Sequence, residues 1–290
     1  MTRVIPVLCA TTALAGLGTV YVMLGAGATE RIDVPKGTSA TPRAPATPPD
    51  PIALAIANAR RTCDVGAIEP VLAQLRAAVA ANSSDRAAWH LLALAHLERA
   101  LLRSHDRGMA VGEPVFDQQP RELLADLDAG HAAVLRAREL GDDSSDLFRI
   151  EAGLLSQRIV DLKTALQWNG KVQDALRAAG ERQTDNPHLH VALGLRKLLA
   201  PRWLGHDAAK ALEHFEFAAK AITDDERPAV FAAMAAFLQK KRLQAIGWLE
   251  QAVARNPDNR FARVVLARLR AGEDDPFGRH VTTAEAAATK

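Results

Sequence analysis

The sequence has few cysteines and aromatic residues and little net charge. Among its 290 residues are two cysteines, Cys9 and Cys63, and one tyrosine, and aromatic residues make up 4% of the chain. Two cysteines cannot build a zinc site of the paired-cysteine type, and no CxxCH haem motif is present. A formal charge of +2, with arginines spread along the chain, excludes the electrostatic signature of a nucleic-acid-binding protein.

The composition also indicates a fold class. Hydrophobic residues make up 48% of the chain and charged residues 24%, as in ordinary globular proteins. The shortage of aromatic residues disfavours a β-sandwich, whereas the abundant alanine favours closely packed helices. We therefore expect an all-α protein.

Motifs of common enzymes and metal sites are missing from the sequence. It has no glycine-rich phosphate loop, no GxSxG and no HExxH, so we predict neither an enzyme nor a cofactor. His188 and His190 are two residues apart, and His90 and His96 are six apart, so on helices their rings would diverge. We therefore predict no metal site.

The N-terminus carries an apolar segment and then a proline-rich one. The uncharged run from Val4 to Thr29 is long enough to span a bilayer, which favours residues 1–28 as a transmembrane anchor. Alternatively, Ala26-Gly27-Ala28 fits a signal cleavage site. We predict a single-pass protein of the bacterial inner membrane with its remaining domain in the periplasm, or a soluble periplasmic protein after cleavage. Residues 29–51 form a Pro/Thr/Ala-rich linker.

After Pro51, apolar residues recur with the period of an α-helix. Short polar turns separate these amphipathic stretches. The pattern predicts helices over residues 52–62, 67–81, 85–104, 119–140, 144–159, 161–181, 187–199, 207–222, 227–239, 242–255 and 258–271.

A repeat of about 34 residues runs through this region, and it is clearest between Glu226 and Asn259. The first helix of that unit carries small residues at its crossing, the second carries Ala245, Leu249 and Ala252, and Asn256-Pro257 closes the unit. A second unit has Leu193-Gly194 on its first helix and Ala211, Phe215 and Ala218 on its second. Weaker units include Trp89 to Ala137 and Asp146 to Ala179.

These units resemble the tetratricopeptide (TPR) repeat. The resemblance implies a right-handed α-solenoid of stacked antiparallel helix pairs over residues 52–272 and a role in protein–protein interaction. We expect the tail, 273–290, to dock Phe277 on the last helix pair and to end in a disordered Thr/Ala stretch.

The resemblance also implies a binding groove lined by the first helix of each pair. The predicted partner-binding residues are His90, Leu94, Leu97, Ile150, Leu154, His188, Val191, Leu195, Met234 and Phe237. Because this groove would be strongly apolar, we expect a protein partner or the chain's own 103–120 insertion to cover it. Alternatively, the array is tightly wound and these residues pack on neighbouring helices.

The predicted function is therefore an exported, membrane-tethered scaffold or adaptor of a bacterial envelope complex. Two other classes stay open. One is a solute-handling accessory of a transport system, which the extended turn over residues 201–206 favours. The other is a structural subunit packed permanently into a membrane complex.

Overall fold

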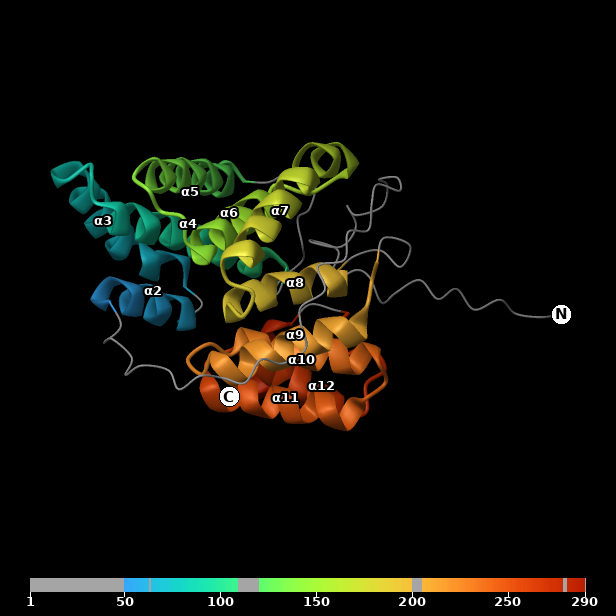
Figure 1. The fold of residues 1–290 in the computed structure, drawn as a ribbon. Coiled ribbons are helices and arrows are strands. Elements are labelled where there is room, and N and C mark those ends of the chain that lie inside the picture. The colour runs from blue at the N-terminus through green and yellow to red at the C-terminus, as the bar shows by residue number, and fades with distance from the viewer. Residues whose placement is uncertain (1–49, 63, 109–119, 200–204, 279–280, 290) are drawn as a thin grey trace.

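The computed structural model describes residues 50–62, 64–108, 120–199, 205–278 and 281–289. These ranges fold into helices and connecting turns and contain no β-strand (Figure 1), which confirms the predicted all-α class. The predicted anchor, nearly all of the linker, residues 109–119 of the insertion and residues 201–204 of the extended turn lie outside the described residues.

The helices agree closely with the predicted ranges. They are α2 (Pro51–Arg61), the 3-10 helix η1 (Val65–Ile68), α3 (Glu69–Ala81), α4 (Arg86–Gly108), α5 (Arg121–Glu139), α6 (Ser145–Ser156), α7 (Leu162–Arg182), α8 (Pro187–Leu199), α9 (Ala208–Ala221), α10 (Arg227–Leu238), α11 (Arg242–Arg255), α12 (Arg260–Arg270) and α13 (Thr283–Ala288).

Neighbouring helices pack as pairs along the chain. The pairs are α4 with α5, α6 with α7, α8 with α9, and α10 with α11. Helix α6 also contacts α4 and α8, and α8 contacts α10, so the first helices of the four pairs form a continuous layer. We call the side of the array formed by α4, α6, α8 and α10 the inner face. This layering is that of a helical-repeat array of stacked helix pairs.

One turn geometry recurs at the ends of α3, α7, α9 and α11. The residues that end α3, α7, α9 and α11 are Asn82, Gln183, Ile222 and Asn256, and all four have extended backbones. In each case the backbone N–H still donates to an alanine carbonyl four residues earlier. The chain therefore leaves these four helices with a similar backbone geometry, whereas it leaves α5 at Leu140 and continues through Gly141, whose φ is 84°. Pro257 lies inside such a turn, as expected for the Asn256-Pro257 pair that closes the repeat unit.

Glycines mark the closest helix crossings. A Cβ on Gly194 would lie 2.6 Å from a ring carbon of Phe215, so α8 and α9 approach at the predicted small-residue position. Gly130 meets Leu154 and His96 in the same way, and Gly153 meets Leu97. The missing side chains at these glycines allow the helix axes to lie close together.

The C-terminal tail is better ordered than the sequence indicated. Phe277 is buried, with its ring centroid 5.5 Å from that of Phe237, so it docks on the last helix pair as expected. Beyond it, the Thr282–Glu285 capping box starts α13, and the Glu285 carboxylate bonds the buried Arg268. The predicted disorder of the final Thr/Ala stretch is therefore wrong over residues 281–289.

The predicted inner-membrane location requires correction. No helix of the described residues is both long enough and apolar enough to cross a membrane. The segment assigned as the anchor, residues 1–28, is outside the part of the chain that the structure describes.

The α8–α9 crossing yields a stability prediction. Gly194→Ala should lower the free energy of unfolding by about 1–3 kcal/mol, because its methyl group has no room beside the Phe215 ring. Gly247→Ala is the matched control, since no atom lies within 4 Å of its added Cβ, and it should be neutral or stabilise by about 0.5–1 kcal/mol. Urea unfolding of the two variants measures both values. Equal changes in the free energy of unfolding for the two variants would contradict the close packing of Gly194 on Phe215.

Candidate binding surface

The inner face carries charged side chains where α4 approaches the α5–α6 turn. His90 of α4 lies between two carboxylates, with Nδ1 2.8 Å from Asp142 and Nε2 3.3 Å from Asp146. Burial alone would lower the pKa of His90, but its hydrogen bonds to Asp146 and Asp142 outweigh that effect and raise it. The site therefore favours a protonated imidazole held between two acids.

Further charged and polar side chains of the inner face lie on α6 and α8. The Arg149 guanidinium donates to Asp146 at 2.9 and 2.6 Å. Burial, followed by the charge of Arg149, lowers the pKa of His188 to about 4, although Asp146 and Asp225 act in the opposite direction. His188 therefore stays neutral at pH 7, and it lies within electrostatic reach of charges on both α6 and the start of α10.

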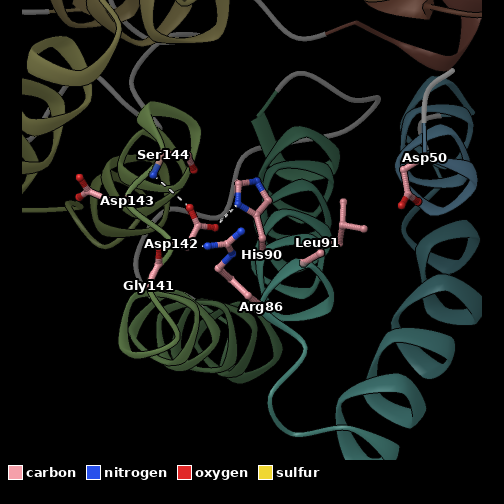
Figure 2. A pocket seen from close by; sticks show the side chains of 9 residues that line it. Asp50, Arg86, His90, Leu91, Gly141, Asp142, Asp143 and Ser144 are labelled. Carbon is pink, nitrogen blue, oxygen red and sulfur yellow. Dashed lines mark hydrogen bonds and ion pairs between the residues drawn. The ribbon is translucent and has the colours of Figure 1, made fainter. Parts of the chain in front are cut away.

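A shallow pocket opens beside His90 (Figure 2). It has a volume of about 490 Å³ and lies between the start of α4, the α5–α6 turn and the residue that precedes α2. Its charged lining residues are Asp50, Arg86, His90, Asp142 and Asp143. Asp142 is held in place by the Ser144 N–H, 3.0 Å from its Oδ1, and by His90. The acidic side chains of the pocket already have partners, because Arg182 donates to Asp143 at 2.7 Å and Asp50 caps α2, so the pocket presents paired charges rather than free carboxylates.

A second group of charges joins distant parts of the chain. Arg227, at the start of α10, donates to Glu98 of α4 at 2.9 and 3.1 Å and to Asp225 at 2.8 Å. Arg60 of α2 lies 3.5 Å from Asp225 and 4.0 Å from Glu98. We call these four residues the closing cluster. Glu98 and Asp225 are only 4% and 2% exposed, so the cluster is largely shielded from water.

The two arginines stabilise the charged state of both acids. Burial would raise the pKa of Glu98, but the charges of Arg227 and Arg60 lower it below its ordinary value. The same two charges outweigh burial at Asp225 and hold its pKa far below the usual range. The cluster is therefore fully ionised and internally neutral at pH 7.

The predicted groove residues fall into two groups. Leu97, Ile150, Leu154 and Met234 are buried in the helical core. Half-buried residues make up the other group, which comprises His90, Leu94, His188, Val191, Leu195 and Phe237. Phe237 packs against Phe277 of the tail, whereas His188, Val191 and Leu195 form one stripe along α8. A role for the groove in binding stays a prediction, and it now rests on this second group.

Sequence reasoning missed the charged half of the inner face. Glu98 follows His90 and Leu94 at intervals of four, so it occupies the same helical face as two predicted groove residues. That spacing was a usable signal. The partners of Glu98, by contrast, are 129 residues away at Arg227 and lie on α2 at Arg60, and no local pattern indicates those contacts.

Comparisons with known proteins identify no family for the chain. No protein-family model matches it, and no curated protein matches it significantly. Among solved structures, it is similar to YrrB, described as a TPR protein with an unusual peptide-binding site. That likeness covers 71% of this chain and 88% of YrrB, at 15% identity and a TM-score of 0.36. At this strength it carries no argument about binding.

The closing cluster yields a stability prediction. Asp225→Ala leaves the two guanidinium groups of Arg227 and Arg60 with Glu98 as their single buried counter-charge, so the free energy of unfolding should fall by about 3–5 kcal/mol. Asp174→Ala removes an exposed i,i+3 ion pair with Arg177 and should cost less than about 0.5 kcal/mol. Urea unfolding compares them. A loss below about 1 kcal/mol for Asp225→Ala would show that the cluster contributes little.

His188 yields a prediction about pH. Because its pKa falls to about 4 in the folded chain, the unfolded chain binds a proton first as the pH drops below the ordinary value of 6.5. The free energy of unfolding of the wild type should therefore fall between about pH 6.5 and 4. That of the His188→Gln variant should fall by on the order of 1–2 kcal/mol less over the same range. Denaturant midpoints at pH 8, 7, 5.5 and 4.5 measure this difference. The gap between variant and wild type should be constant above pH 7.5, and a constant gap down to pH 4.5 would contradict the assignment.

Proposed function

We propose that this protein is a non-enzymatic adaptor that binds a segment of another protein along its inner face. The observation that supports this most is the α8 stripe, His188, Val191 and Leu195, which is only half-buried at the centre of a layer whose other helices are largely packed. A half-buried stripe flanked by charges combines apolar contact with polar specificity, as protein-binding surfaces commonly do.

The chemistry of the partner follows from the lining of the inner face. Val191 and Leu195 offer aliphatic contact, and the pocket at His90 offers paired acidic and basic side chains. A segment that combines apolar residues with a polar residue at one end fits both features. The polar group would approach Arg86 and Asp142, while the apolar residues would lie over α8.

Site-directed photocrosslinking tests the proposal. A photoreactive phenylalanine analogue placed at Val191 should crosslink to a discrete partner in cells, because that position lies in the half-buried α8 stripe. The same analogue at Leu166, which is 57% exposed on α7, serves as the control for accessible surface and should give no matching adduct. The adducts are identified by mass spectrometry.

A matched pair of charge substitutions gives the affinity. Val191→Glu should weaken binding of the identified partner at least about tenfold, whereas Leu166→Glu should change it less than about twofold. Equal crosslinking at both positions, or unchanged affinity with Val191→Glu in a chain of normal stability, would contradict the inner-face proposal. A partner that never dissociates would favour a permanent structural subunit instead.

A further inference from the structure

Helix α2 occupies part of the inner face without belonging to any helix pair. It packs chiefly on α4 rather than on α3, its neighbour in sequence. Ile56 and Ala59 are buried, and Ile52 and Ala55 lie half-buried in the same apolar cluster as Leu94 of α4. The opposite face is open, with Leu54 49% exposed. Helix α2 is thus an amphipathic helix lying on a surface formed by the repeats.

The C-terminal end of α2 contacts the far end of the array. Arg60 reaches Asp225 at that end as well as Glu98 of α4, and its Nη2 donates to the Asp224 carbonyl at 3.4 Å. Arg61 donates to the Arg255 carbonyl at 2.8 Å, and Asn256 donates to the Arg61 carbonyl at 3.1 Å. These polar contacts are made by the two arginines and by the backbone at the end of α2, whereas Ile56 supplies the buried apolar contact. The surface beneath α2 therefore favours an apolar side chain followed four residues later by an arginine.

The charge of this surface is complementary to such a helix. Without Arg60, the closing cluster would hold two buried acids against the single guanidinium of Arg227, leaving one negative charge uncompensated. Any helix that replaces α2 must supply a cation at that point. The fit of α2 itself is incomplete, because the buried Arg60 Nε has no hydrogen-bond partner.

We propose that the surface beneath α2 is an exchangeable docking site for a cationic amphipathic helix from a partner protein, and that α2 is its resident competitor. The partner helix carries an isoleucine or leucine, a small residue three positions later and an arginine at the fourth, matching Ile56, Ala59 and Arg60. Binding requires α2 to dissociate from this surface. The apparent affinity for the partner helix is therefore the intrinsic affinity multiplied by the fraction of molecules in which α2 has dissociated. This inference rests on the proposed role of the inner face in protein binding.

The test uses the full-length chain and a fluorescent peptide with the sequence of residues 50–62. By fluorescence anisotropy, the peptide should bind a full-length Ile56→Asp chain at least about tenfold more tightly than wild type, because the weakened resident helix frees the site. Leu54→Asp is the matched control on the exposed face of the same helix and should resemble wild type. The Arg60→Gln peptide should bind the Ile56→Asp chain at least about tenfold more weakly than the unaltered peptide.

The outcomes decide between an exchangeable and a permanent helix. Equal affinity of the peptide for Ile56→Asp and wild-type chains, or equal binding of a scrambled peptide, overturns the proposal. If Ile56→Asp does not fold, a full-length Arg60→Gln chain takes its place with the same expected gain. In wild type, hydrogen exchange should show α2 amides opening more readily than those of α10, and exchange of both only on global unfolding would overturn the proposal too. Since no partner is needed, failure here leaves the crosslinking test of the proposed function unaffected.

Discussion

The ion pair between Glu98 and Arg227 joins two helices that are separated by most of the repeat array. Glu98 lies on α4, in the first full pair, and Arg227 opens α10, in the last. Stacked repeats contact mainly their neighbours, so a direct contact between first and last pairs requires a tightly curved array. Curvature of this degree brings Asp225 and Arg60 into the same cluster and gives α2 a surface that spans both ends.

Local features produce that curvature. The extended residues at the ends of α3, α7, α9 and α11 redirect the chain in a similar way, and Gly141, with a φ of 84°, redirects it after α5. Glycine crossings such as Gly194 against Phe215 keep the packed helices close together. Small errors in these turns would accumulate over four pairs and separate Glu98 from Arg227. The closing cluster therefore depends on the accuracy of every intervening repeat, and in return it opposes unwinding of the array.

Helical periodicity and alanine spacing were sufficient to predict the helices and their pairing, because both signals are local. The capping box of Thr282 and Glu285 was an equally local signal, and it indicated the helix that was expected to be disordered. The place of α2 could not be predicted, since its partners are long-range charges. The binding surface was predicted as an apolar groove, yet Ile150 and Leu154 are core and the inner face is lined with paired charges. Burial in a curved array depends on how far the repeats wind, which residue spacing alone does not determine.

A double-mutant cycle between Glu98 and Arg227 tests this account most directly. Glu98→Gln, Arg227→Met and the double variant are unfolded in urea, and the coupling energy is the deviation from additivity. If the two ends of the array are joined as the structure shows, the coupling between these residues, 129 positions apart, should be at least about 1.5 kcal/mol. Additivity within about 0.3 kcal/mol, with each variant folded, would show that the first and last pairs do not meet in solution.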